Sequence, residues 1–191
     1  MDAFKISIKL FAVNDDFGHS DFVPVFQHWM QKHSFADHLL IDVADYAHVP
    51  AGPGTVLITS EANLYTDRAG NRLGLLYTRK LPLEGTFGDR LRAVLSSTIK
   101  AATMLEAEPT LAGRLKFRTD EWLLRINDRL LAPNTPETFA QVKPDVEAVA
   151  KVLYPGETVT LDCKPSGLTL FEVTVKASVS PSLGELSGRL G

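Results

Sequence analysis

The chain has 191 residues, of which 45% are hydrophobic and 23% are charged, a composition typical of globular proteins rather than disordered ones. No apolar run approaches the roughly 18 residues needed to cross a bilayer, and lysines interrupt the N-terminal segment where a secretory leader would be apolar, so we expect a soluble, cytoplasmic protein without membrane association. The basic residues are scattered and not interleaved with aromatics, which argues against nucleic-acid binding.

Charge is distributed unevenly along the chain. Residues 1–67 carry a net charge of −6, residues 68–129 carry +5, and residues 130–191 carry −2. Either the three segments mix in the fold and the asymmetry averages out, or the protein has one acidic and one basic surface. Two such surfaces would favour self-association or an anionic partner.

The first third of the chain alternates between strand and helix patterns. Residues 4–13 alternate apolar and polar side chains, as in a strand. Ser20 or Asp21 can cap a helix that runs to about Ser34, with Pro24 in its first turn. A strand is expected at residues 39–43, although this stretch is ambiguous between strand and helix.

The stretch HVPAGPG (48–54) combines a histidine with prolines and glycines and precedes the strand-like TVLITS. Glycine loops that hold phosphate precede a helix N-terminus, and the prolines here remove two backbone donors. We therefore interpret this stretch as a rigid turn that starts a strand and exclude a nucleotide-binding P-loop. A ligand-facing loop remains the alternative, because Pro and Gly fix a backbone shape.

Three hairpins and two further helices are predicted in the remaining chain. NLYTDRAGNRLGLLYTRK reads as a hairpin, RLKFRTDEWLLRIND as a second that turns at TDE, and the runs flanking KPSG as a third. One helix begins after Thr86, with Asp89 completing a capping box, and should stop before Pro109. The other begins at Asn134 as cap, and Pro144 should kink or split it.

Together these elements predict an α+β fold, mainly an antiparallel sheet of hairpins covered on one face by three helices. Residues 1–177 form this single domain, and residues 178–191, rich in Ser and Gly, form a flexible C-terminal tail. With Leu183, Leu186 and Leu190 spaced along it, the tail resembles the short cargo-loading peptides that dock into bacterial encapsulin shells. That resemblance implies possible docking of the tail to another protein.

Candidate chemistry is concentrated in residues 19–48, which hold all five histidines together with four aspartates. Imidazole and carboxylate groups together form metal sites and proton-transfer sites. His28, Asp45 and His48 would converge if the first helix packs over the following strand, and they are the candidate catalytic residues. Ordinary surface and helix-end histidines are the alternative interpretation.

The stretch RINDRLLAPNT is a second candidate site, for binding. Asn127, Asp128, Arg129 and Asn134 gather polar groups between a strand and a helix start. A turn followed by a helix cap explains the same residues. The single Cys163 permits no internal disulfide, is typical of a reducing compartment, and is interpreted as a structural residue at a strand end.

The leading hypothesis is a non-catalytic binding or assembly protein that forms a homodimer through an exposed sheet edge or through the charge asymmetry. The alternative is a small metal-assisted or general acid–base enzyme that uses the His/Asp cluster at 19–48. The chain has no diagnostic catalytic, zinc or nucleotide motif. The combination of IDVADYAHVPAGPG, GNRLGLLYTRK and NDRLLAPNTPETF resembles a set of bacterial proteins of similar length with no assigned activity, which implies a bacterial, cytoplasmic, single-domain protein.

Overall fold

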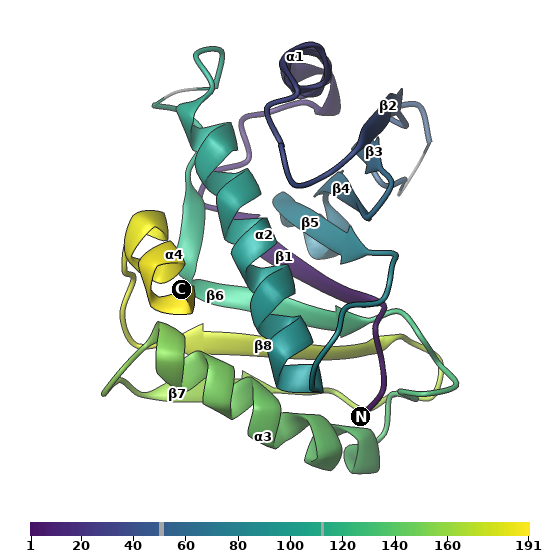
Figure 1. The fold of residues 1–191 in the computed structure, drawn as a ribbon, viewed down its shortest axis with the longest axis vertical. Helices are drawn as coiled ribbons and strands as arrows, with labels where there is room; N and C mark the ends of the chain where they lie inside the picture. The colour runs from purple at the N-terminus through teal and green to yellow at the C-terminus, as the bar shows by residue number, and fades with distance from the viewer. Residues whose placement is uncertain (50–51, 112) are drawn as a thin grey trace.

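The structure is a computed structural model that describes residues 1–49, 52–111 and 113–191, and it combines one sheet with a layer of helices (Figure 1). The described residues form these strands: β1 Ile6–Ala12, β2 Leu40–Asp45, β3 Thr55–Thr59, β4 Ala62–Asp67, β5 Gly74–Arg79, β6 Phe117–Ile126, β7 Val159–Asp162 and β8 Phe171–Ala177. They form these α-helices: α1 Val23–Lys32, α2 Phe87–Ala107, α3 Pro136–Leu153 and α4 Leu183–Leu190.

All eight described strands belong to one antiparallel sheet in the order β2-β3-β4-β5-β1-β6-β8-β7. The first strand of the chain therefore lies inside the sheet, between β5 and β6, and β2 and β7 are the outer strands. The predicted α+β class, an antiparallel sheet covered by helices, is confirmed.

Two of the three predicted hairpins are present. β4 and β5 pair across a turn in which Gly70 has a φ of 70°, and β7 pairs with β8. The hairpin expected at residues 114–128 is wrong, because β6 is a single ten-residue strand. The Thr119–Glu121 stretch looked like a turn because it is polar and interrupts the apolar alternation. In the structure it is a place where β6 departs from its pairing with β1.

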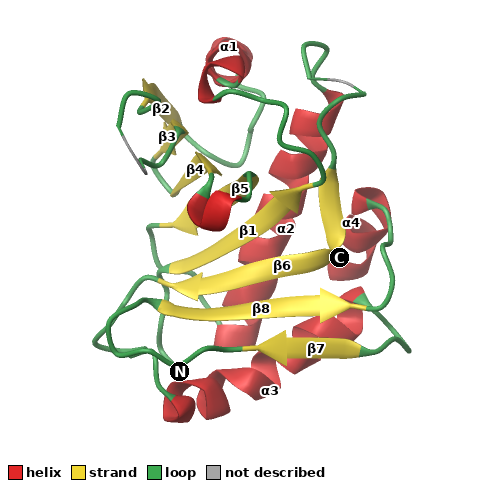
Figure 2. Cartoon of the chain, turned by 180° about the vertical axis from the view of Figure 1, so that it is seen from behind, coloured by secondary structure: helices red, strands yellow, loops and turns green. Residues whose placement is uncertain are grey.

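Helices α2, α3 and α4 lie on the same face of the sheet, in front of it in Figure 1 and behind it in Figure 2. The capping box of Thr86 and Asp89 is confirmed, and α2 ends before Pro109 as predicted. Its apolar stripe, which includes Leu91 and Leu105, is buried against the sheet. Among the described residues, no helix is both long enough and apolar enough to cross a membrane.

The predicted helix caps need correction at two positions. Neither Ser20 nor Asp21 caps α1, because Asp21 instead accepts a hydrogen bond from Gly18 N, and the N-cap position falls on Phe22. Thr135, not Asn134, caps α3 and accepts from Thr138 N at 3.3 Å. The side-chain amide of Asn134 does not cap the helix but donates to Lys164 O and Thr169 Oγ1 in the β7–β8 loop.

Pro144 does not split α3, which runs unbroken from Pro136 to Leu153. Its ring lies on the exposed side of the helix. The carbonyl left without an intrahelical donor can therefore be hydrated, so the interruption costs less than it would in a buried helix.

The C-terminal segment is helical where a flexible tail was expected. Ser182 and Glu185 form a capping box that begins α4, and Leu183, Leu186 and Leu190 are buried. The spacing of three and four residues that resembles a docking peptide also forms the apolar stripe of a helix. α4 packs beside α2 and α3 (Figure 1), so its leucines belong to the core of this chain.

The opposite face of the sheet, turned toward the viewer in Figure 2, has no helix in front of β1, β6 and β8 among the described residues. Its polar side chains pair with one another. Lys9, only 1% exposed, donates from Nζ to Asp67 Oδ2 at 2.5 Å and to the Arg72 carbonyl at 2.7 Å. Arg125 Nε donates to Glu172 at 2.6 Å. Ion pairs across strands thus take the place of a second layer at the centre of this face.

Candidate functional site

The outer strand β2 exposes apolar side chains to solvent. Leu39, just before it, is 66% exposed, and Ile41 is 54% exposed. Tyr46 N donates to Gly54 O at 3.0 Å, and by the alternation of an antiparallel ladder Val43 and Asp45 then direct their backbone groups away from β3. An outer strand with solvent-facing apolar side chains is a surface to which another strand can be added.

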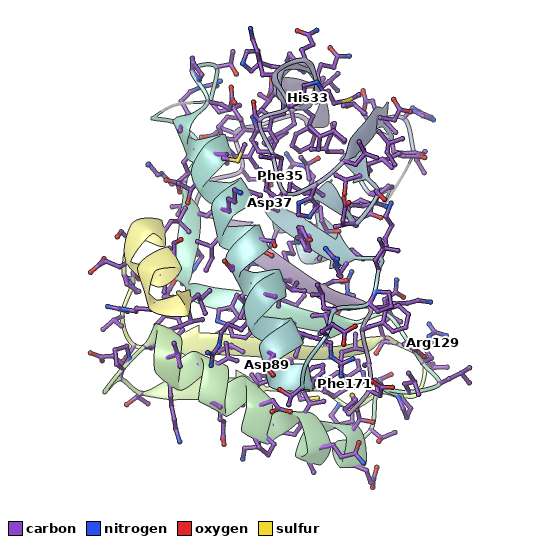
Figure 3. All side chains as sticks on the ribbon, in the orientation of Figure 1. His33, Phe35, Asp37, Asp89, Arg129 and Phe171 are labelled. Carbon is purple, nitrogen blue, oxygen red and sulfur yellow. The ribbon has the colours of Figure 1, made fainter. Side chains whose placement is uncertain are left out.

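A cluster of aromatic rings fixes the chain where it enters β2. After α1 ends at His33, whose φ is 50°, Phe35 turns inward and is 1% exposed. The Phe35 ring stacks on the His38 imidazole with centroids 4.3 Å apart, and His38 Nε2 is 2.7 Å from the Tyr77 hydroxyl on β5. Figure 3 shows Phe35 and Asp37 beside α2.

The charge states in this cluster follow from burial and hydrogen bonding. Burial lowers the pKa of His38, so its imidazole is neutral at pH 7, and burial raises the pKa of the Tyr77 hydroxyl. Partial burial acts to raise the pKa of Glu61, but backbone N–H groups, first among them Leu39 N at 3.0 Å, together with the nearby His38 and Arg79 outweigh it, so the pKa lies below its ordinary value. Glu61 on the β3–β4 turn therefore holds the start of β2 as a carboxylate.

The β2–β3–β4 region carries acids without nearby lysines or arginines in sequence. Residues 33–67 contain five acidic residues and no Lys or Arg. Asp37 pairs with Lys100, which lowers the pKa of its carboxyl, and Asp67 pairs with Lys9. The other three acids form no ion pair with any described residue: Asp42, Asp45 and Glu61.

The carboxylates of β2 instead bind its own backbone. Asp42 Oδ1 accepts from Val43 N at 2.8 Å, and Asp45 Oδ1 accepts from Ala47 N at 2.9 Å. Asp42 thereby occupies an amide that faces away from β3. The surface formed by Leu39, Ile41, Asp42 and Asp45, called the β2 edge below, is thus both apolar and acidic.

The turn after β2 has the predicted role of starting a strand, since β3 begins at Thr55. Val49 N donates to Tyr46 O at 2.9 Å, Gly52 N donates to Val49 O at 2.9 Å, and Gly54 has a φ of 72°. Pro50 and Ala51, in the middle of HVPAGPG, lie outside the described residues. The alternative of a ligand-facing loop stays a prediction.

Two of the three candidate catalytic residues, Asp45 and His48, are three positions apart in the sequence and so lie at the same end of β2. Asp45 ends β2 and His48 lies in the following turn, where its ring stacks with Tyr46 at 6.5 Å between centroids. His28 is exposed on α1 and lines a different hollow of about 260 Å³, beside Glu108. Among the described residues no group of three or more His, Cys, Asp or Glu side chains could hold a metal ion.

The candidate binding residues lie at the other end of the molecule, as His33 and Arg129 show in Figure 3. Asp128 Oδ1 accepts from the backbone N–H of Leu130 and Leu131, and Arg129 donates to the Leu168 carbonyl at 3.2 Å. Asn134 is 6% exposed and donates to Lys164 O and Thr169 Oγ1.

Asn127 uses its backbone N–H to bind the Lys5 carbonyl, next to these loops. Asn134 lines a cavity of about 460 Å³ with residues of the β7–β8 loop. The contacts seen here tie two loops to each other, so the structure gives these residues a structural part, and binding by them stays a prediction.

Sequence reasoning named Asp45 and His48 but missed the exposed apolar residues beside them. The sequence did contain a sign of an acidic surface in this region, because residues 33–67 include no Lys or Arg. That β2 is an outer strand could not be read, because strand order depends on contacts between distant segments. Comparisons with protein-family models, with curated proteins and with solved structures found no match to this chain.

Proposed function

We propose that this chain is a non-catalytic binding protein that adds an extended segment of a partner protein to the β2 edge. One observation carries the proposal: an outer strand exposes Leu39 and Ile41 beside acids that have no described cationic partner. Addition of a strand to a sheet edge gives affinity through backbone hydrogen bonds and specificity through alternating side chains.

The chemistry of the edge defines the partner segment. Because Asp42 occupies the Val43 N–H, the outward backbone groups left for a partner are the Val43 carbonyl and the N–H and carbonyl of Asp45, and pairing with them requires an extended chain without proline at the paired positions. Side chains next to Leu39 and Ile41 should be apolar, and those next to Asp42 and Asp45 should be lysine or arginine. Asp42 and Asp45 are three positions apart and lie on opposite faces of the strand, so the partner is an extended segment that carries both apolar and basic residues.

Charge argues for a different protein rather than a second copy at this edge. Two copies joined through β2 would place two acidic ribbons side by side, and like charges across paired strands are destabilising. Light scattering distinguishes homodimerisation, the other form of the assembly hypothesis, from binding of a different protein.

The cellular setting belongs to the same proposal. Cys163 directly follows β7, and burial together with nearby Asp162 raises the pKa of its thiol, which keeps it unreactive. A single unreactive thiol and the sequence resemblance support a bacterial, cytoplasmic protein.

The test measures binding of two fluorescent synthetic peptides of about ten residues, one alternating valine with lysine and the other valine with glutamate. We expect at least a ~10-fold preference for the lysine peptide, lost at high salt. The double variant Asp42→Asn with Asp45→Asn keeps the backbone acceptors and should remove the preference. Asp162→Asn on the other outer strand is the matched control and should not.

Equal affinity for both peptides, or an equal loss in Asp162→Asn, would contradict the proposal. Light scattering of the free protein at low and high salt addresses the second copy. If the protein is a dimer at both salt concentrations and Ile41→Ser makes it monomeric, the β2 edge binds a second copy of the chain and not a basic segment of another protein.

A further inference from the structure

β6 bows away from β1 at one point of the sheet. Leu10 pairs with Trp122 and Ala12 with Phe117, so a single residue of β1 faces four residues of β6, Arg118–Glu121. Such bulges re-aim side chains and are common beside binding sites. This is the same polar stretch that resembles a turn in the sequence.

A cleft of about 480 Å³ opens at this bulge, within the range of cavities that hold small ligands. It lies between the end of β1 and the segment that follows it, the segment just before β5, and the bulge of β6. Its polar lining includes Asn14, Arg72, Arg118, Thr119, Asp120 and Ser180.

Two arginines are held in fixed orientations at the cleft. Arg72 donates from Nη1 and Nη2 to Glu121 at 2.9 and 2.8 Å, and its guanidinium lies 3.7 Å from the centroid of the Phe11 ring. Arg118 donates from Nε and Nη2 to Asp120 at 3.1 and 2.6 Å. Each guanidinium uses two of its five N–H groups in these bonds, which leaves others to face a ligand.

The charges at the cleft do not balance. Glu121, 4% exposed, is approached by Arg72, by Arg118 at 3.6 Å and by Lys176 at 3.7 Å. With Asp120, three cations therefore share two carboxylates. The neighbouring acid at the rim, Asp15, is already paired with Arg68. Asp16, whose carboxylate is bound by the Asn14 amide, adds a further negative charge beside the cleft, so the excess of one positive charge is confined to the group around Glu121 and Asp120, where a carboxylate ligand would bind.

Asn14 provides a second, independent feature of the cleft. Its Nδ2 donates to Asp16 Oδ2 at 3.0 Å, which fixes the amide orientation because a carboxylate only accepts. Its Oδ1 is buried and has no hydrogen-bond partner among the described residues. A buried acceptor without a donor is costly, and Asn14 lines the cleft, so a ligand that reaches Oδ1 as the side chains covering it move aside would supply the missing donor.

We propose that this cleft binds a small hydroxylated monoanion whose carboxylate bridges Arg72 and Arg118 and whose hydroxyl donates to Asn14 Oδ1. Carboxylate geometry matches the planar guanidinium fork, and the orientation of both arginines before binding lowers the entropy cost of binding. The site is separate from the β2 edge, since it is built from β1, β6 and the segment just before β5.

Three six-carbon molecules test the ligand class by calorimetry and by NMR shifts of backbone amides. Gluconate carries the carboxylate and hydroxyls, sorbitol only hydroxyls, and hexanoate only the carboxylate. We expect saturable binding of gluconate, at least ~10-fold tighter than of the other two. The amide shifts should centre on residues 12–14 and 118–120.

Arg118→Gln should weaken gluconate binding by ~10-fold or more. Asn14→Ala should bring gluconate down to the affinity of hexanoate, and it keeps the test open if Arg118→Gln fails to fold. Arg92→Gln, exposed on α2, is the control and should bind as the wild type does. No saturation by gluconate, equal affinity for gluconate and hexanoate, or shifts centred elsewhere would overturn the proposal.

Discussion

Charged side chains are bound differently at the centre of the sheet and at its β2 edge. At the centre, Lys9, Glu121 and Arg125 are each held by a partner from another strand or loop. At the β2 edge, Asp42 and Asp45 bind only the backbone around them. Buried charges must be paired to be tolerated, whereas exposed ones remain available to a partner. The comparison indicates that the centre is built for stability and the edge for contact.

The largest effect should come from breaking a pair at the centre. Lys9→Met leaves the Asp67 carboxylate and the Arg72 carbonyl without their donor in a nearly dry site. We expect a loss of about 3–5 kcal/mol in the free energy of unfolding, measured by urea titration. The double variant Lys9→Met with Asp67→Leu should recover part of it, and a loss below about 0.5 kcal/mol in the single variant would refute the comparison.

A smaller loss is expected in the helix layer that covers the centre. Leu186→Ala in α4 removes a side chain that is 2% exposed, and should lower the free energy of unfolding by about 2–3 kcal/mol. Ser187→Ala, on the exposed side of the same helix, should change it by less than about 0.5 kcal/mol. If both variants melt like the wild type, α4 is dispensable and the tail is free to dock elsewhere.

The smallest effect concerns the anchor of the β2 edge and depends on pH. The pKa of His38 lies below its ordinary value of 6.5 because of burial, so below about pH 6.5 the unfolded chain binds a proton that the folded chain resists. Stability should therefore fall as the pH drops from about 7.5 to 5.5. Thermal melts of His38→Phe should show a flatter pH dependence, while His28→Gln, exposed on α1, should match the wild type. If the melting temperature of His38→Phe depends on pH as steeply as that of the wild type, His38 is not the group responsible for the loss of stability at low pH.

The candidate site was only partly visible in the sequence. Asp45 and His48 were selected for acid–base chemistry with His28, but His28 lines a separate hollow. The arginines of the cleft were not selected, because Arg72 and Arg118 lie 46 positions apart and meet only through Glu121. A turn-like stretch at Thr119–Glu121 marked the right place but was assigned the wrong structure.

The features that could be predicted from the sequence alone are those set by local hydrogen bonding and side-chain periodicity. The capping box at Thr86, the strand predicted within residues 4–13 and the turn between β4 and β5 depend on residues a few positions apart, and the structure contains each of them. The strand order, the exposure of β2, the bulge in β6 and the docking of α4 were decided only in the tertiary structure. Each depends on surfaces that meet across dozens of residues, and the same local pattern can be buried or exposed according to what packs against it.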